Sequence, residues 1–517
     1  MRPAALACAQ CRSRHLKCDG GRPVCRRCTV EGSECHYTPS RRGQRRRAQQ
    51  RSNREDIATT TTAATGQAAS IPISATLIEL YFANFHPAHP ILVPKLVYNA
   101  IPIPESLRAV VRYIGSILST TTTSGHFAKA AAFALEQDQS WSAFRVQALL
   151  LFSIALHSMN EQMQAQQYLS KAVDLATVLH MNRYGFAAAN SGGQPVLEES
   201  LRRTWWELYT IDGLMAANHQ RKFFRCSNVE LDAGLPCEDP TFLAGQFILP
   251  APRLSQFDNR IFDDTEKAFS SYCYRIEAVR LLARVIAIAE NADIDKDEFT
   301  AVDNSLAGWR YHLPPCKADI TRTEKAADID ELMFQAQLIV HFATILLHLP
   351  RSNLRSVHPL TSPMPCCPWS TPLAPTCTTQ NHLMKVTAAS QGLSDLAALR
   401  TSHDHTPLLA CGLILGSLVQ LSICSLHASN CITQHRERVM LMIGVLKSLG
   451  RVWTLANRGL TQLRQYAKEI LQRPTACAAP NAQYNTAADF AEAIEAPPAT
   501  RNGNPNGDST HIDISWM

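Results

Sequence analysis

The sequence has little charge for its length of 517 residues. Asp, Glu, Lys and Arg make up 18% of it, against roughly 25% in an average globular chain, which excludes a highly charged disordered protein. It contains no P-loop, dinucleotide-binding glycine motif, zinc-protease motif or serine-hydrolase elbow, and its histidines are dispersed. No enzyme is therefore predicted. The length and the 46% apolar content exclude a disulfide-stapled miniprotein and predict a substantial core in more than one unit.

Two kinds of apolar segment are also missing. The first residues contain no apolar stretch of about 7 to 15 residues behind a basic start, so no secretory signal is predicted. The most apolar stretch, residues 408–426, is interrupted by Gln420 and three serines, whereas a membrane span needs about 20 mostly apolar residues with anchoring flanks. We predict a buried helix over this stretch and no membrane partner.

Positive charge, by contrast, is concentrated at the N-terminus. The first 54 residues contain 14 basic and 3 acidic residues, a net charge of +11 in a chain whose total is +6. A segment of that charge is expected to bind a polyanion. Six of the 17 cysteines lie in the same region. In the reducing compartment expected of a chain without a signal, regularly spaced cysteines hold metal more often than they form disulfides.

The six cysteines repeat the spacing C-x2-C-x6-C twice, with six residues between the copies: Cys8, Cys11, Cys18, Cys25, Cys28 and Cys35. One tetrahedral zinc takes four ligands, so six thiolates satisfy two zinc ions only if two of them bridge. The pseudo-symmetry of the spacing nominates Cys8 and Cys25 as the bridges. About 28 residues cannot build a core, so the metal must supply the folding free energy. A zinc module that contacts protein, or a copper or iron–sulfur site, is the less favoured alternative.

Basic side chains between these cysteines are candidates for DNA contacts. Six thiolates and two zinc ions would carry a net charge of about −2, and the remaining positive charge is available to phosphates. If residues 11–17 form a short helix, its far end points away from the metal, where side chains reach base edges in the major groove. The predicted contacts are Arg14, His15 and Lys17 to bases, and Arg12, Arg26 and Arg27 to phosphates. A role for His15 as a zinc ligand is disfavoured because the thiolates already fill both metals.

Residues 8–35 resemble the DNA-binding module of the fungal binuclear zinc-cluster transcription factors. The resemblance implies two zinc ions held by all six cysteines, a first helix in the major groove, and recognition of short CGG-type triplets. By position, Lys17 matches a frequent family lysine and Arg14 matches a basic residue near the DNA. His15 departs from the lysine or arginine that is common at its position.

Residues 36–70 are predicted to form a basic arm followed by a flexible linker. The arm offers phosphate contacts and a nuclear-import signal through Arg41, Arg42, Arg45, Arg46 and Arg47; a merely solvated tail is the alternative. Residues 58–70 are low in complexity and lack aromatic, leucine or valine anchors, as a flexible linker does. Residues 41–70 show no apolar heptad repeat, so a homodimer would have to form through the rest of the chain.

Residues 71–473 are predicted to form a large all-helical domain, so the predicted fold class is mainly α. Long apolar segments there have a helical period, and almost none alternate as strands do. Helices are expected over residues 144–157, 165–180, 196–217, 265–290, 328–348, 383–399, 408–426 and 435–471, the first two as an antiparallel pair. Residues 77–92, 146–183 and 201–224 resemble the fungal-specific transcription factor ("middle homology") domain, an all-helical regulatory body.

One predicted helix of this body carries an aromatic cluster and adjacent arginines. Trp205, Trp206 and Tyr209 could line a small-molecule pocket, but aromatic residues at helical spacing are more often core, and core packing is predicted. Arg202 and Arg203 are predicted to form structural ion pairs, and their candidate partners are Glu198, Glu199 and Asp212.

Residues 474–517 are predicted to be a disordered acidic tail. Two segments of the tail mix acids with apolar residues, as activation segments that contact co-regulators do, although a tail without function is nearly as compatible with them. Together these observations predict a nuclear, sequence-specific, DNA-binding transcription factor of RNA polymerase II type. A regulator of a metabolic or secondary-metabolite gene cluster fits the habit of the family. The alternative is a zinc-dependent protein-interaction scaffold without sequence-specific DNA binding.

Overall fold

The computed structural model describes residues 8, 10–11, 14, 16–21, 23–33, 35–36, 73–245, 247, 250–262, 268–291, 293–320, 329–354, 379–399, 405–426 and 432–471. The chain divides into two compact units, Met1–Ser70 and Ile71–Met517. Throughout the described residues the regular structure is helical, with no strand, which confirms the predicted fold class. The predicted arm and linker from residue 37 onward and the predicted acidic tail lie outside the described residues.

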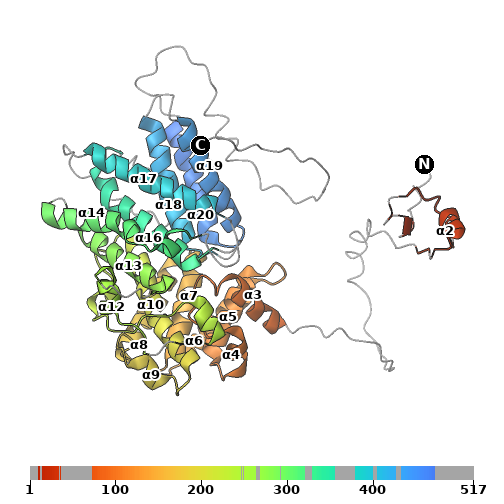
Figure 1. Cartoon of the computed structure of the whole chain (residues 1–517), viewed down its shortest axis with the longest axis horizontal. Coiled ribbons are helices and arrows are strands. Elements are labelled where there is room, and N and C mark those ends of the chain that lie inside the picture. Colours follow the sequence, from red (N-terminus) through yellow and green to blue (C-terminus); the bar gives the residue numbers. More distant parts are fainter. Residues whose placement is uncertain are drawn as a thin grey trace, which may run out of the picture. The chain divides into compact units, whose positions relative to one another are not determined.

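Among its described residues, the N-terminal unit contains the short helix α2 (Arg26–Glu31) (Figure 1), and Gln10 and Cys11 are also helical. The helix begins because the sulfur of its N-cap, Cys25, accepts a hydrogen bond from the N–H of Cys28. The carboxylate of Asp19 accepts a second one from the N–H of Arg26 at 3.1 Å. The helix ends at Gly32, whose φ of +61° lies in the left-handed region that favours glycine.

The second unit is built from helices and short connections (Figure 1). Its α-helices of six or more residues are α3 (Ile73–Asn84), α4 (Lys95–Ala100), α5 (Glu105–Leu118), α6 (Ser124–Gln137), α7 (Ala143–Ser158), α8 (Gln162–Val178), α10 (Pro195–Asn218), α11 (Asp239–Ala244), α13 (Ser271–Ile288), α14 (Lys296–Tyr311), α16 (Glu331–His348), α17 (Thr379–Ala398), α18 (Leu409–Leu426), α19 (Ile432–Leu449) and α20 (Thr454–Leu471). Shorter segments are α9 (Phe186–Asn190), α12 (Leu254–Asp258) and α15 (Pro315–Ala318), with 3-10 turns at Arg225–Asn228, Asn259–Ile261 and Leu349–Arg351. Helices α3 to α9 gather toward one end of this unit and α17 to α20 toward the other, with α10, α13 and α16 between them.

Side-chain caps mark where several of these helices begin. The side chain of Ser142 accepts a hydrogen bond from the backbone N–H of the third residue of α7. Asp295 does the same for the third residue of α14, and Asp330 for the third residue of α16. Serine and aspartate are preferred at this position because their short side chains satisfy N–H groups that have no partner within the helix.

The predicted helical hairpin is confirmed by α7 and α8, which pack along each other. Phe152 and Tyr168 meet edge to face with ring centroids 4.7 Å apart, and Leu149 and Ala172 are buried between the helices. The hydroxyl of Ser153 donates to the carbonyl of Ala165 at 2.7 Å, so a polar side chain of α7 is also satisfied by α8.

A close approach between α3 and α5 depends on Gly115. A Cβ placed there would lie 2.0 Å from the carbonyl oxygen of Leu77, and backbone cannot move aside as a flexible side chain can. The absence of a side chain on α5 therefore allows the backbone of α3 to pack directly against it.

The other predicted helices correspond to observed ones, with one correction. The expected helix over residues 435–471 is wrong as a continuous element, because a turn at residues 450–452 separates α19 from α20. The turn lets buried Trp453 reach Phe85, with ring centroids 6.2 Å apart, and lets α20 pack back on α18. The described helices outside the expected ranges are α3, α4, α5, α6, α9, α11, α12, α14 and α15.

Helix α16 is the most membrane-like segment among the described residues. Residues Glu331–Arg351 are long and apolar enough to cross a bilayer, but 83% of their most apolar window is buried inside the protein, as in the core helix of a soluble protein. The predicted helix over residues 408–426 appears as α18, and its described residues are almost all buried.

The aromatic cluster of α10 is confirmed as core. Trp205, Trp206 and Tyr209 are at most 2% exposed, and the indole N–H of Trp206 donates to the carbonyl of Gly234 at 2.8 Å.

The arginine pairs of α10 are partly as predicted. Arg202 pairs with Glu198 and Glu199, and the buried Arg203 pairs with Glu199 at 2.9 Å. Asp212 is not their partner, because its carboxylate accepts from the N–H of Cys226 at 2.9 Å. Asp239, 36 positions further along the chain, pairs with Arg203 instead.

A buried polar chain joins the middle helices. Glu207 of α10 accepts from Arg275 of α13 and lies 2.8 Å from the Nδ1 of His89. Arg275 also donates to the Oε1 of Gln335 on α16 at 2.6 Å. The charged pair and His89 are fully buried, and the positive charge of Arg275 is the main reason that the pKa of Glu207 falls to about 2 in spite of burial, which raises it.

Candidate metal centre and nucleic-acid interface

The six predicted metal ligands lie together in the N-terminal unit. Their sulfurs form two groups of four, and within each group all four sulfurs lie within 4.8 Å of one another. One group is Cys8, Cys25, Cys28 and Cys35, and the other is Cys8, Cys11, Cys18 and Cys25. Cys8 and Cys25 therefore belong to both groups, which are the two positions that the sequence spacing nominates as bridges.

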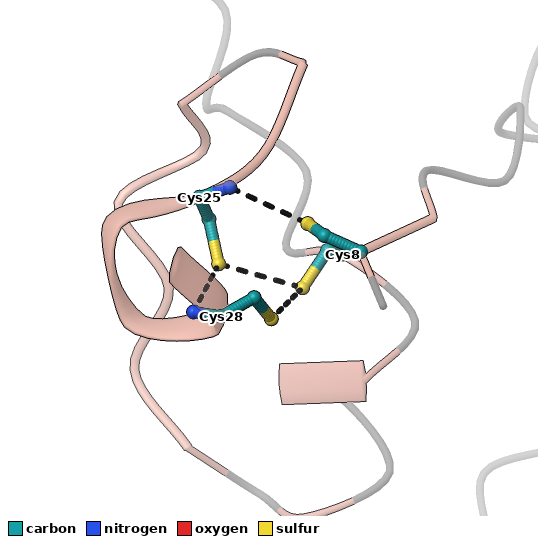
Figure 2. A group of neighbouring side chains, drawn as sticks. Cys8, Cys25 and Cys28 are labelled. Atoms are coloured by element: carbon teal, nitrogen blue, oxygen red, sulfur yellow. Dashed lines mark hydrogen bonds between the residues drawn. The ribbon is translucent and has the colours of Figure 1, made fainter. Parts of the chain in front are cut away.

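The spacing of the sulfurs suits zinc rather than disulfides. The Sγ of Cys8 lies 3.8 Å from those of Cys25 and Cys28, and Cys11 and Cys25 are 3.7 Å apart. Figure 2 shows the thiols of Cys8, Cys25 and Cys28 directed at one another. A disulfide needs about 2.05 Å, whereas four sulfurs at about 2.3 Å from a tetrahedral zinc lie about 3.8 Å apart. The residues present therefore fit two bridged zinc ions.

The surroundings of the sulfurs also distinguish the two shared cysteines. The N–H of Cys11 donates to Cys8 and that of Cys28 to Cys25, each at 3.4 Å, and these bonds are the main reason that the pKa of both shared thiols is lowered. Burial instead raises the pKa of Cys11 to about 12. A metal ion supplies the positive charge that a buried thiolate of this kind requires.

Among the predicted DNA contacts, four basic side chains are described. Arg14, Lys17, Arg26 and Arg27 are exposed, whereas Cys8, Cys11, Cys25 and Cys28 are buried. The unit thus has a sulfur interior and a basic exterior, the arrangement that a phosphate-binding surface needs. The remaining predicted contacts, Arg12, His15, Arg41, Arg42, Arg45, Arg46 and Arg47, lie outside the described residues.

The local structure of the zinc module corrects one prediction and shows contacts of two acidic residues that the sequence analysis did not name. Cys11 is helical, but Leu16 and Lys17 are not, so the expected helix over residues 11–17 does not extend to Lys17. Glu31 lies 3.5 Å from Arg14 and 4.0 Å from Arg27. Sequence reasoning missed this contact and the cap made by Asp19. No local signal pointed to either contact, because Asp19 is not at the N-cap position of α2, which is Cys25. Only the folded cluster brings Asp19 to Arg26 and Glu31 to Arg14.

Comparison with known proteins agrees with this geometry. The model of the fungal Zn(2)-Cys(6) binuclear cluster domain matches residues 6–44, and that of the fungal specific transcription factor domain matches residues 78–246. The chain is 31% identical over 557 residues to the C6 finger domain transcription factor iacK of Pestalotiopsis fici, covering 92% of this chain and 82% of that protein. The chain belongs to the fungal Zn(2)-Cys(6) transcription factors. As a Zn(2)-Cys(6) factor it is a DNA-binding regulator of transcription with two zinc ions.

A second relative matches over the zinc module alone. The sorbicillinoid biosynthetic cluster transcription factor sor3 of Hypocrea jecorina is 56% identical over 34 residues, which is 7% of this Zn(2)-Cys(6) chain and 5% of that protein. No solved structure matches the chain.

Proposed function

We propose that the protein is a nuclear, sequence-specific regulator of RNA polymerase II transcription that recognises CGG-like triplets. The observation that carries this proposal is the pair of overlapping four-sulfur groups surrounded by exposed Arg14, Lys17, Arg26 and Arg27. Buried sulfurs fix the backbone, and long basic side chains that start from a fixed backbone can reach base edges and phosphates in one register.

In this proposal all six cysteines hold the metal, and Cys8 and Cys25 bridge. When bound, zinc supplies the positive charge that keeps the thiolates ionised and the cross-links that replace a hydrophobic core. Arg14, His15 and Lys17 contact bases. Arg12, Arg26, Arg27 and the arginines of the arm contact phosphates, and the arm also directs nuclear import.

The remaining roles that we propose belong to the rest of the chain. The helical body, residues 71–473, supplies a homodimer contact, and the tail, residues 474–517, contacts co-regulators. We propose control of a metabolic or secondary-metabolite gene cluster, because the relative sor3 is named for a biosynthetic cluster. No catalytic residue is assigned.

The proposal is tested with the full-length, zinc-loaded protein and labelled duplexes. We expect a gel shift with a CGG-containing duplex that persists against excess scrambled duplex and weakens steeply with salt. Metal analysis of the same sample should return two zinc ions per chain. Equal binding to both duplexes, or no binding in a sample that holds two zinc ions, would favour the protein-interaction scaffold and contradict the proposal.

A further inference from the structure

The last two described helices carry a concentrated positive charge. Residues 432–471, which form α19, α20 and the turn between them, contain seven basic and two acidic residues, a net charge of +5. The whole chain beyond residue 54 carries −5, because the first 54 residues hold +11 of a total of +6. Residues 451–468 contain four basic residues and no acidic one. Positive charge gathered in one part of an acidic body indicates a surface for a polyanion.

Helix α20 presents this charge on one side. Its other side includes the buried Leu455, Leu463 and Tyr466 and packs on α18 and α19. The outward side is exposed, and its described charged residues are all basic. We call the following four residues the basic face: Arg451, in the turn before the helix, and Arg458, Arg464 and Lys468. Because the apolar side is fixed on the body, these side chains start from a rigid surface.

The arginines of the basic face lack carboxylate partners. On other surfaces of the body, Arg183 pairs with Glu230, and Arg225 pairs with Asp174. The three arginines of the basic face form no ion pair with any acidic side chain that the structure describes. The Nε of Arg464 is buried and has no hydrogen-bond partner in the same part of the chain. An anion bound at this face would therefore meet positive charge that the described side chains do not neutralise.

We propose that the basic face binds the phosphate backbone of the DNA duplex that the zinc module holds. Arginine and lysine are the usual phosphate contacts, and amide side chains also donate to phosphates; Asn457 and Gln465 are exposed beside them. Arg458 and Lys468 are ten positions apart, which is about 15 Å along a helix. That length exceeds the width of the major groove, about 12 Å, so the face can meet phosphates of both strands.

The duplex is the favoured occupant because the chain itself keeps it within reach. The described parts of the two units are joined by residues 37–72, and 36 residues span at most about 130 Å. A duplex on the zinc module therefore meets the basic face as an intramolecular partner. The acidic tail is the rival occupant, but its net charge of −4 is spread over 44 residues, whereas duplex DNA carries one charge per about 1.7 Å.

The proposal is tested with the full-length, zinc-loaded protein and 40-base-pair duplexes. The variant combines Arg451→Gln, Arg458→Gln and Arg464→Gln. In fluorescence anisotropy at low salt we expect it to bind a CGG-containing duplex about tenfold or more weakly than the wild type. The slope of log affinity against log salt should be flatter by about two to three. Phosphate contacts carry no sequence information, so a scrambled duplex should show the same losses.

A matched control removes the same charge elsewhere on the body. It combines Lys129→Gln, Lys296→Gln and Arg310→Gln, at exposed positions of α6 and α14, and its salt slope should differ from that of the wild type by less than about one. Urea midpoints check that both triple variants are folded. If the triple variant of the basic face is unfolded, the variant that combines only the exposed Arg451→Gln and Arg458→Gln decides, with an expected flattening of about two.

Two results would overturn the proposal. An unchanged slope in the variant of the basic face would assign this face to the acidic tail or to an acidic protein partner. Equal changes in this variant and the control would mean that only total charge matters. The inference rests on DNA binding by the zinc module and not on its preference for CGG. Equal binding of the wild type to both duplexes would therefore contradict the proposed function, while the salt slopes would still decide this inference.

Discussion

Glu31 holds two of the exposed basic side chains beside the zinc cluster. Its carboxylate lies 3.5 Å from Arg14 and 4.0 Å from Arg27, and all three side chains are more than 40% exposed. Ion pairs at that exposure contribute little because water competes for both partners. Arg14 can therefore exchange Glu31 for a DNA group at little cost in free energy.

The predicted division between base and phosphate contacts leads to one test. Arg14→Ala should relax the base preference at one position of the site and weaken specific binding by about 1–3 kcal/mol. Arg46→Ala, in the arm, should weaken binding to all sequences about equally and flatten the salt dependence by about one charge. Binding-site selection on both variants measures this, and identical base profiles for Arg14→Ala and the wild type would reject the assignment.

Acid should destabilise the body through buried histidines such as His341. Burial lowers its pKa from 6.5 to about 4, so the neutral form is favoured in the folded state. A group whose folded pKa is lowered contributes stability above its unfolded pKa, and that contribution is lost as the pH falls from about 6.5 toward 4. Between pH 7 and pH 4.5 the free energy of unfolding should therefore fall by about 2 to 3 kcal/mol less in His341→Gln than in the wild type. Urea midpoints at the two pH values measure the difference, and His312→Gln, at an exposed position, should behave as the wild type.

At the scale of elements, the packing of α3 on α5 provides a sharp test. Gly115→Ala places a methyl group against the backbone of Leu77, so the helices must separate, and we expect a loss of about 1–3 kcal/mol or more. Gly444→Ala is the matched control, because a Cβ on this exposed position of α19 meets nothing within 4 Å. It should be neutral or stabilise by up to about 1 kcal/mol. Equal thermal shifts in the two variants would contradict the packing.

The buried polar chain between α10, α13 and α16 provides a second test at this scale. Arg275→Met leaves Glu207 as an uncompensated buried charge, and we expect a loss of about 3–5 kcal/mol in chemical unfolding. Arg280 lies on the same helix as Arg275 and forms a surface ion pair with Asp258. Arg280→Met removes this pair, and its cost in free energy of unfolding should stay below about 1 kcal/mol. A small effect of Arg275→Met would mean that the body relaxes and admits water to Glu207.

Elements could be predicted where local sequence decides them. Helices α7 and α18 could be predicted because each is a long apolar run, almost all of which is buried, and such a run needs no tertiary information to be recognised. The break between α19 and α20 could not be predicted in this way, because it depends on Trp453 reaching Phe85, far away in the sequence. The metal site could be predicted from ligand number and spacing alone. The buried polar chain could not, since His89, Glu207 and Arg275 meet only in the fold.

For the whole molecule, the division into two units predicts separate responses to metal removal. A zinc chelator should abolish DNA binding by the full-length protein, because the zinc module has too few residues for a core. The helical signal in far-UV circular dichroism should hardly change, because the described helices other than the short α2 and the turn at Cys11 lie in the second unit. Chelator already saturated with zinc is the control. Binding that persists without zinc, or a large loss of helicity, would contradict this prediction.

The apolar character of α16 has a consequence for synthesis. In the finished protein this helix packs against α13, which precedes it, and against α17 and α18, which follow it. A ribosome therefore delivers a segment apolar enough to cross a membrane before α17 and α18, which cover it in the folded protein, have been synthesised. We therefore expect nascent chains to need protection by chaperones during that interval, and a message truncated just after codon 354 to yield a product that aggregates.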